Sequence, residues 1–343
     1  METVTANSPA DTAIETIESL LDVTYTWGYQ DTRTKLRDLY DKGVRAQWFV
    51  EEVLPWDTNV DLDLAMPNEQ MNPLFGSDIY RRLSEKERRA IGNETFVWSL
   101  SQFMHGEQGA LLATAQLVDS VDSLDSKLTA ASQVADEARH VDVYNRYITS
   151  KVGYRYPINP YLKSLLDLIL KDSRWDMKFL GMQIMVEGLA LAAFGMLRST
   201  TAEPLIQALT AYVMGDEARH VAFGILSLRD YYRQQPENVR REREDFVFEA
   251  ARLMRDRFLF QEVWEKAGLP TKQCMDITLN NQGQMMFRQL LFAKIVPAIK
   301  KMDLLSDRQR ERFAQIGILQ FESAPDPLAD MQHSATGAST ARL

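Results

Sequence analysis

The apolar residues of this chain recur mostly at the three- and four-residue spacing of amphipathic helices. Four of them follow that spacing near the start of the chain: Ile14, Ile17, Leu20 and Leu21. The pattern predicts a helix from Thr12 to about Val53, which Pro55 halts. A proline-rich stretch over residues 55–76 then predicts a long loop.

Polar residues mark where several later helices begin. Ser84 and Glu87 have the spacing of a capping box in front of a helix that runs to about Val118. Ser173 and Asp176 predict a second box. The remaining predicted helices cover residues 126–152, 161–171, 173–197, 204–234, 237–267, 271–302 and 306–317. No stretch sustains the alternation of a β-strand, so we expect an all-α fold.

Two short polar loops divide the central helices into hairpins. The loops are Asp119–Asp125 and Ser199–Glu203, and a crossover around residues 154–160 joins the two hairpins. Short loops make neighbouring helices antiparallel, and two such hairpins form a four-helix bundle. We therefore predict a bundle over about residues 84–235, with additional flanking helices.

The composition is that of an ordinary globular protein. Of the 343 residues, 45% are hydrophobic and 25% are charged. We predict a single helical domain over residues 12–320, with a flexible lead at 1–11 and a disordered tail at 321–343. The first residues lack the basic start and apolar run of a signal peptide, which favours a cytoplasmic protein.

Charge and cysteine content argue against several classes of partner and site. A net charge of −9 disfavours nucleic acid and anionic membranes as partners held by electrostatics. Apolar runs such as Leu189–Leu197 are too short to span a bilayer. Cys274 is the single cysteine, which excludes a disulfide scaffold and a thiolate metal site.

One six-residue phrase occurs twice in the chain. Asp136–Val141 reads Asp-Glu-Ala-Arg-His-Val, and Asp216–Val221 repeats it eighty positions later. Each copy holds a Glu and a His three residues apart, which puts both side chains on one face of a helix. A lone Glu lies thirty residues before the Glu of each copy, within an apolar helical stretch: Glu107 and Glu187.

These residues predict a dimetal site. Four carboxylates that meet out of water must be protonated or neutralised, and two divalent cations cancel their charge. One imidazole for each metal, from His140 and His220, suits iron or manganese better than zinc. The alternative is that Glu137 and Glu217 are surface residues paired with neighbouring arginines. Two identical copies, each with its own upstream Glu, favour the metal site.

Residues three and four positions from a ligand share its helix face. These neighbours are mostly apolar, and Gly106, Gly109 and Gly188 leave space beside the metals. An apolar cavity suits an organic substrate, although the same residues also serve simply to pack a bundle. The predicted substrate pocket consists of Phe103, Met104, Ala110, Leu111, Ile184, Ala190, Leu191, Val213 and Met214.

The aspartate in front of each repeated Glu has a separate predicted role. Asp136 and Asp216 can accept the free ring N–H of a ligand histidine from the neighbouring helix. Arg139 and Arg219 are then expected to pair with these aspartates.

The order Glu, Glu-x-x-His, Glu, Glu-x-x-His resembles the ferritin-like diiron-carboxylate superfamily over about residues 80–235. Its members include multicomponent monooxygenase hydroxylases, acyl-carrier-protein desaturases, amine N-oxygenases and the ribonucleotide reductase small subunit. The resemblance implies a ferritin-like bundle with two irons, or Fe/Mn or Mn, and dioxygen as co-substrate. It implies one metal at Glu107, Glu137 and His140, another at Glu187, Glu217 and His220, and bridging by Glu137 and Glu217.

Two positions distinguish this chain from particular members, and two further features match the reductase small subunit. Hydroxylases typically have Thr where this chain has Leu191, and N-oxygenases resembling the aminobenzoate enzyme have a further His ligand where it has Val213. Tyr144 matches the position of the radical tyrosine in the reductase small subunit. Trp48–Asp57, followed by Leu83–Arg88, is similar to the helix that precedes the bundle in that subunit and in its oxidase relatives.

The resemblance implies a dioxygen-activating oxidoreductase that hydroxylates, desaturates or N-oxygenates a small or acyl-type organic substrate. The alternatives are a radical-storing subunit that uses Tyr144 and an iron-handling bundle without enzymatic activity. The chain has no flavin, nicotinamide or iron–sulfur motif, so an external electron donor such as a ferredoxin or a flavin reductase is expected. A homodimer is also expected, from the resemblance and from the apolar helices predicted at 12–53 and 271–302.

Overall fold

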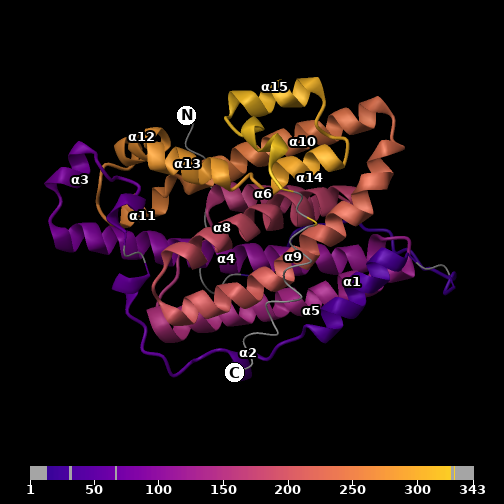
Figure 1. The fold of residues 1–343 in the computed structure, drawn as a ribbon, viewed down its shortest axis with the longest axis horizontal. Helices are drawn as coiled ribbons and strands as arrows, with labels where there is room; N and C mark the ends of the chain where they lie inside the picture. Colours follow the sequence, from indigo (N-terminus) through magenta and orange to yellow (C-terminus); the bar gives the residue numbers. More distant parts are fainter. Residues whose placement is uncertain (1–13, 31–32, 66–67, 326–327, 329–343) are drawn as a thin grey trace.

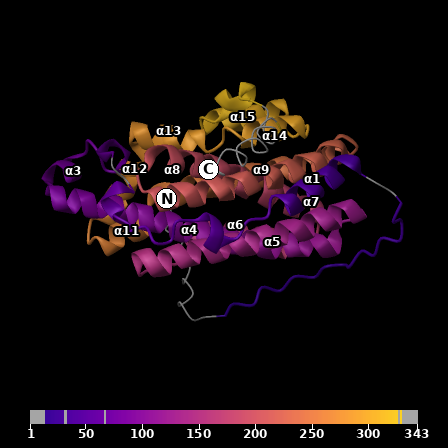
Figure 2. The same ribbon diagram turned by 60° about the horizontal axis from the view of Figure 1, so that its bottom comes forward.

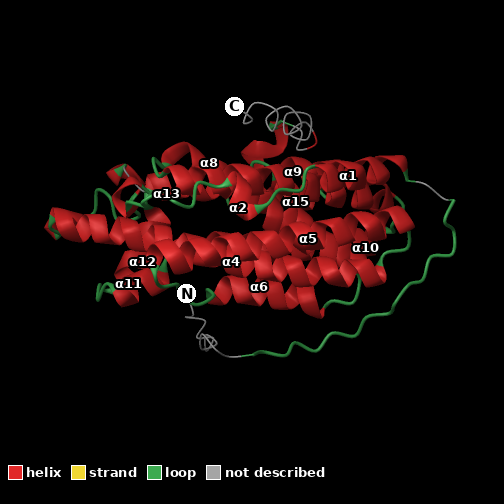
Figure 3. Ribbon diagram, turned by 90° about the horizontal axis from the view of Figure 1, so that it is seen from below, coloured by secondary structure: helices red, strands yellow, loops and turns green. Residues whose placement is uncertain are grey.

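Helices make up most of the protein, for which a computed structural model describes residues 14–30, 33–65, 68–325 and 328. Within these ranges there is no strand (Figure 3), which confirms the predicted all-α fold. The predicted lead at 1–11 and most of the predicted tail at 321–343 lie outside the described residues. The α-helices are α1 Thr34–Arg45, α2 Val50–Val53, α3 Asp78–Arg82, α4 Glu85–Ser120, α5 Leu124–Tyr147, α6 Pro160–Lys171, α7 Trp175–Phe179, α8 Glu187–Thr200, α9 Pro204–Arg233, α10 Glu237–Asp256, α11 Gln261–Lys266, α12 Thr271–Asn280, α13 Gln282–Leu290, α14 Ile295–Lys301 and α15 Asp307–Gln315.

The four-helix bundle consists of two antiparallel hairpins. Helix α4 packs along α5, α8 packs along α9, and α5 contacts α9 across the bundle (Figure 1). Ser84 and Glu87 form the predicted capping box at the start of α4. Pro204 occupies the first turn of α9, where its missing N–H costs no hydrogen bond. The bundle therefore follows the predicted connectivity.

The second long helical stretch is not uniform. Between α7 and α8 the residues Leu180–Val186 form a π-helical segment, η4, that ends directly before Glu187. The predicted Ser173–Asp176 capping box is wrong, because α7 begins after Arg174 without a side-chain cap. Asp176 is instead buried and bound to Arg243 at 3.0 Å. An ion pair with a distant helix has replaced the local cap.

By length and composition, Trp175–Thr200 passes the test for a membrane-spanning helix. Its most apolar window of 18 residues is 72% buried inside the protein. The stretch lies at the centre of the bundle and contacts α9, α4 and α14. Its apolar character is that of a core helix that other helices surround on most sides.

The predicted helix at 12–53 is largely wrong. Residues 14–30 run along the outside as an extended segment (Figures 2 and 3), and helix begins only at Thr34. In the second half of this segment apolar Val23, Tyr25 and Trp27 alternate with polar residues, and such β-branched and aromatic residues favour extended backbone. Thr26 donates a hydrogen bond to the Asp122 carbonyl at 2.8 Å and helps fix the segment to the α4–α5 loop.

The flanking helices after the bundle are shorter than predicted. The helix expected at 237–267 ends at Asp256, and a 3-10 turn, Arg257–Leu259, follows it. Phe258 leaves the helical conformation there, and Phe260 has a positive φ of 56°. The stretch 271–302 forms three helices, of which α13 starts at the side-chain cap of Asn281. These helices cover one face of the bundle (Figure 1).

Candidate metal centre

The repeated motif and the two lone glutamates meet inside the bundle. Glu107 comes from α4, Glu187 is the first residue of α8, and α5 and α9 each supply one Glu–His pair. All six side chains are buried. The structure therefore brings together the six predicted ligands, which are Glu107, Glu137, His140, Glu187, Glu217 and His220.

Their ligand atoms fall into two groups that share Glu137. One group contains Glu107, Glu137, His140 and Glu217, and the other contains Glu137, Glu187 and His220. Within each group the ligand atoms lie within 4.8 Å of one another. Nδ1 of His140 lies 3.2 Å from Glu217 and 3.5 Å from Glu137. Nδ1 of His220 lies 3.1 Å from Glu137 and 3.7 Å from Glu217. Glu137 and Glu217 thus lie between the two imidazoles, where bridging ligands belong.

Several of these atoms have no hydrogen-bond partner among the described residues. They are Oε2 of Glu137, Oε2 of Glu187, both carboxylate oxygens of Glu217 and Nδ1 of His220. Buried carboxylate oxygens without partners are costly, and such atoms in a protein core need a bound ion or a proton. Four carboxylates and two imidazoles match the charge and donor preference of two divalent ions of the iron or manganese type. The donor set therefore fits a dimetal centre.

The same crowding of charge shifts the pKa values of the ligands. Burial, and then the charge of Glu217, raise the pKa of Glu107 to about 8. Burial and Glu217 also raise the pKa of Glu187. Burial opposes ionisation of Glu137, but the charges of His220 and His140 and their hydrogen bonds to this carboxylate together outweigh burial and lower the pKa of Glu137. In the metal-free protein, protons on some of these glutamates balance the charge that two metal cations would otherwise balance.

The two histidines are also held strongly basic. Burial opposes protonation of His140, but its contacts with Asp216 and Glu107 outweigh burial and raise the pKa of this histidine. Burial likewise opposes protonation of His220, and the charges of Glu137 and Glu217 raise its pKa. Both rings must lose a proton when Nδ1 coordinates a metal, so metal binding at this centre releases protons.

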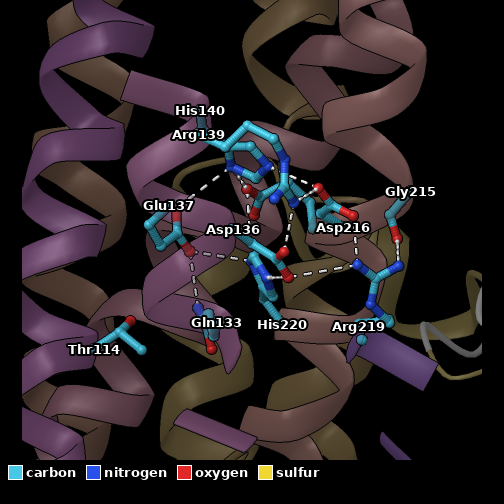
Figure 4. A network of polar contacts seen from close by, with 12 residues as sticks. Thr114, Gln133, Asp136, Glu137, Arg139, His140, Gly215, Asp216, Arg219 and His220 are labelled. Atoms are coloured by element: carbon cyan, nitrogen blue, oxygen red, sulfur yellow. Dashed lines mark hydrogen bonds and ion pairs between the residues drawn. The ribbon is translucent and has the colours of Figure 1, made fainter. Parts of the chain in front are cut away.

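Each aspartate of the motif contacts the histidine of the other motif. Nε2 of His140 lies 3.1 Å from Asp216, and Nε2 of His220 lies 3.3 Å from Asp136 (Figure 4). Arg139 donates to Asp136 and to Asp216, at 3.0 Å in the second case. Arg219 pairs with the same two aspartates. The carboxylates fix both rings with Nδ1 facing the glutamates, and the arginines balance the charge of the carboxylates.

Two residues from outside the bundle complete this network. Trp48 donates its indole N–H to Asp216 at 2.8 Å, and Gln47 donates to Asp136 at 2.7 Å. The Arg139 guanidinium lies 4.7 Å from the centre of the Trp48 ring. Sequence reasoning did not assign these two residues a role. A signal was available, because Trp48 opens the stretch that is similar to the helix before the bundle in the reductase subunit.

Gln133 is a further polar residue of the centre that the sequence analysis missed. Its Nε2 donates to Glu137 at 2.9 Å (Figure 4). The same Nε2 donates to Glu187, also at 2.9 Å. Gln133 precedes Glu137 by one helical turn, so it shares the face of that ligand. It links a glutamate of one hairpin to a glutamate of the other and fixes their relative position.

Tyr144 lies beside the centre without a polar partner. Its ring is buried, and among the described residues no group bonds its hydroxyl. Phe103 and Phe194 pack against it, with ring centres 6.1 Å and 6.0 Å away. Burial, and then the charge of Glu107, raise the pKa of Tyr144. The phenol is therefore held neutral in an apolar environment.

A small cavity adjoins the glutamates between α4 and α8. Three of the predicted pocket residues line it, Phe103, Ala110 and Ala190. Met104, Ile184, Leu191 and Val213 are buried elsewhere in the core, Leu111 is partly buried, and Met214 lines a separate surface hollow. Residues outside the predicted pocket complete the lining: Gln102, Gly106, Glu107, Val186, Glu187, Phe194, Glu217 and Arg257.

Of the three glycines expected to leave space, only Gly106 lines this cavity. A Cβ on Gly109 would lie 2.6 Å from Leu166, and one on Gly188 would lie 3.2 Å from Ile295. These two glycines therefore admit neighbouring helices rather than a substrate. Phe103 also borders a second, larger apolar pocket that opens between α4, α8 and α13. Phe103 therefore lines both spaces.

The amino-acid sequence matches a known family over most of its length. The model of the P-aminobenzoate N-oxygenase AurF family matches residues 29–303. The chain belongs to this family. No match was found among curated protein sequences. The family assignment confirms that the protein is a dimetal-carboxylate oxygenase of the ferritin-like type, as the order of its motifs predicts.

Solved structures resemble the chain more distantly. Two variants of R2-like ligand-binding oxidase, both with anaerobically reconstituted Mn/Fe cofactor, are 15% and 16% identical to it, with TM-scores of 0.48 and 0.47. The matches cover 82% and 79% of this chain and 94% of each oxidase chain. At these TM-scores the likeness carries no further argument, and the family assignment rests on the sequence match.

One departure from the aminobenzoate enzyme persists within the family. Val213, at the position where N-oxygenases resembling that enzyme have a further histidine, is fully buried in the core. It precedes Glu217 by one turn of α9. Among the described residues, the groups that could hold a metal contain His140 and His220 and no other histidine. The missing histidine alters the ligand set without removing the chain from the family.

Proposed function

We propose that this protein N-oxygenates an organic amine at a diiron centre, with dioxygen as co-substrate. The observation that carries the proposal is the cluster of four buried carboxylates beside an apolar cavity, in a chain of the N-oxygenase family. We propose iron because it is the metal that the resemblance to diiron-carboxylate proteins implies, and the carboxylate and imidazole ligands suit it. An aromatic amine suits the cavity, since the rings of Phe103 and Phe194 offer flat, apolar contacts and Val186 adds an aliphatic one.

The six ligands would hold the two ions, which supply the redox chemistry with dioxygen when bound. Asp136 and Asp216 orient the histidine rings, and Gln133 fixes Glu137 relative to Glu187. The aromatic lining excludes water from the amine. An uncharged amine nitrogen enters this space more readily than an ammonium ion, whose burial is costly.

The reaction transfers one oxygen atom of dioxygen to the amine nitrogen and gives a hydroxylamine. The second oxygen atom leaves as water and takes up two electrons and two protons. The described chain holds no group that supplies these electrons, and we propose an external donor such as a ferredoxin or a flavin reductase.

The direct test is oxidation by the iron-loaded protein. Protein loaded anaerobically with two equivalents of Fe(II) is exposed to labelled dioxygen with an electron donor and p-aminobenzoate or another aromatic amine. Mass spectrometry should find the label on nitrogen in an amount that depends on metal. Protein loaded with Mn(II) alone is the metal control. Label on carbon instead of nitrogen, across a panel of amines, would contradict N-oxygenation.

We also propose that two copies of the chain associate. The helix predicted at 12–53 does not carry this proposal, because residues 14–30 are extended. The segment nevertheless exposes large apolar side chains: Ile14 is 96% exposed, Leu20 89% and Trp27 75%. Such a run favours burial against a partner.

Light scattering tests this association. The full chain should give twice the monomer mass of 39.3 kDa. A variant with Val23, Tyr25 and Trp27 replaced by Ser should shift toward the monomer without loss of helix content. A wild-type monomer at high concentration would contradict the proposal.

A further inference from the structure

The two groups of ligand atoms differ in how many carboxylates surround each histidine. Nδ1 of His140 lies close to three carboxylates, those of Glu217 at 3.2 Å, Glu107 at 3.3 Å and Glu137 at 3.5 Å. Among the described residues, Nδ1 of His220 contacts two, those of Glu137 at 3.1 Å and Glu217 at 3.7 Å. The group that contains His220 is therefore the less complete of the two.

The amide of Gln133 connects Glu187 to the less complete group. Its Nε2 donates to Oε1 of Glu187 and to Oε1 of Glu137, at 2.9 Å in each case. The same oxygen of Glu137 lies 3.1 Å from Nδ1 of His220 (Figure 4). The amide end of Gln133 therefore lies at the group that Glu137, Glu187 and His220 form.

The amide of Gln133 also has an unused acceptor. The residue is 2% exposed, and its Oε1 has no hydrogen-bond partner among the described residues. A buried amide oxygen without a partner is uncommon, because nothing offsets the cost of removing it from water. A half turn about the last side-chain torsion exchanges Oε1 and Nε2 and leaves the rest of the side chain in place. Gln133 can therefore present either an N–H donor or an oxygen ligand to the same group.

Which end of the amide faces the glutamates depends on what neutralises their charge. In the metal-free centre the carboxylate oxygens are acceptors, so the amide NH2 is a favourable neighbour. When the same oxygens hold a divalent cation, the NH2 end is repelled and the carbonyl oxygen is attracted. Four glutamates already cancel the charge of two cations, so a neutral oxygen ligand completes the second group without adding charge.

We propose that the carbonyl oxygen of Gln133 is a ligand of the metal ion that Glu187 and His220 hold, and that this ion binds second. The group that contains His140 has three carboxylates and an imidazole, so it binds the first ion without Gln133. The inference rests on the dimetal centre of the proposed function, and its test involves neither turnover nor an amine.

The test follows the two ions separately. Metal-free protein is titrated anaerobically with Mn(II), with calorimetry for the affinities and electron paramagnetic resonance for the state of each ion. In wild type a single-ion signal should rise up to about one equivalent and give way to that of a coupled pair. Gln133→Leu should weaken the second binding event at least about tenfold and change the first by less than about threefold. Gln133→Glu, which keeps an oxygen at the end of a side chain of equal length, should restore the second event.

Infrared spectroscopy tests whether the amide oxygen itself is the ligand. Coordination through oxygen weakens the carbonyl bond, so the band of the glutamine side-chain carbonyl should move to lower frequency when the second ion binds. Protein labelled with carbon-13 at the glutamine side-chain carbonyl identifies the band. The shift should be absent in Gln133→Leu, whereas a residue that only positions Glu137 and Glu187 would not produce it.

Gln183→Leu is the matched control. Gln183 is also buried with an unpartnered Oε1, but its Nε2 donates to Thr114 and not to a glutamate. This variant should leave both binding events unchanged.

Three results would overturn the inference: equal weakening of both events in Gln133→Leu, no single-ion signal in wild type, or a carbonyl band that does not move. If Gln133→Leu does not fold, the wild-type band and the second event of Gln133→Glu decide the question. Two-step binding that depends on Gln133, without oxidation of any amine, would instead contradict the proposed function alone.

Discussion

One turn before the Glu of each repeated motif, the first hairpin has Gln133 and the second has Val213. Gln133 donates to two of the glutamates, whereas Val213 is a fully buried apolar residue. Seven residues after the same Glu the pair is Tyr144 and Gly224. The two hairpins supply the same ligands but surround them differently.

The π-helical segment explains the second of these differences. It lies against α9, and a Cβ on Gly224 would lie 2.8 Å from Gln183 and 3.0 Å from Ile184. The corresponding part of α4 is regular, and there Phe103 and Tyr144 pack ring against ring. The repeated motif therefore fixes the metal ligands but not the side chains that surround them. The space around each metal is free to differ, and the cavity adjoins Glu217 but not its counterpart Glu137.

Removing a ligand that both halves share should have the largest effect. In Glu137→Ala or Glu217→Ala the remaining buried carboxylates face an incomplete ligand set, and we expect metal and activity to be lost together. Elemental analysis of both variants measures this. Glu85→Ala, an exposed glutamate at the start of α4, is the control and should retain its metal. Full metal occupancy in both ligand variants would contradict the assignment of Glu137 and Glu217 as metal ligands.

The position before the motif tests the asymmetry directly. Gln133→Leu removes both hydrogen bonds that join Glu137 and Glu187, and we expect metal affinity to fall about 10–100-fold. Val213→Ala, at the equivalent position, should cost about 2 kcal/mol of stability and leave metal affinity within about threefold. Competition with a chelator and thermal unfolding distinguish the two. Equal loss of metal affinity in both variants would mean that the hairpins are equivalent after all.

The sequence was sufficient to predict the metal ligands, which repeat, but not the residues around them, which occur in only one half of the chain. Spacing on a helix was sufficient to find the ligands, because two Glu-x-x-His copies on buried helix faces are typical of a dimetal site. Gln47 and Trp48 were missed because contacts to residues about ninety and 170 positions away leave no local pattern. The extended segment at 14–30 was mistaken for a helix because four apolar residues happened to fit helical spacing.

The metal-free protein should lose stability as pH rises. The folded-state pKa of Glu107, about 8, lies above its ordinary value of 4.5, so its contribution to stability is fully present below about pH 4.5 and is lost as pH rises from there to about 8. Glu187, His140 and His220 shift in the same direction. Unfolding temperatures should fall between about pH 5 and 8 for metal-free protein and stay nearly level for loaded protein. A level metal-free profile would show that the protons are held elsewhere.

The smallest effect is expected at Tyr144. Its hydroxyl has no partner among the described residues, so Tyr144→Phe should change stability by about 1 kcal/mol or less and leave substantial turnover. Electron paramagnetic resonance after exposure of the ferrous protein to dioxygen should show no persistent tyrosyl radical that function requires. A stable radical lost in Tyr144→Phe together with all activity would falsify the oxygenase interpretation and favour the radical-storing alternative.

The exchange of aspartates between the two motifs also bears on how the protein assembles. Asp136 of α5 contacts the ring of the α9 histidine, and Asp216 of α9 contacts the ring of the α5 histidine. If the chain were split in the segment between the hairpins, each fragment would carry a histidine whose orienting carboxylate lies on the other fragment. Neither fragment alone would take up metal well, while an equal mixture of the two would do so. Metal uptake can therefore be used to measure whether two such fragments associate. It reports the pairing of the two halves rather than the folding of either half alone.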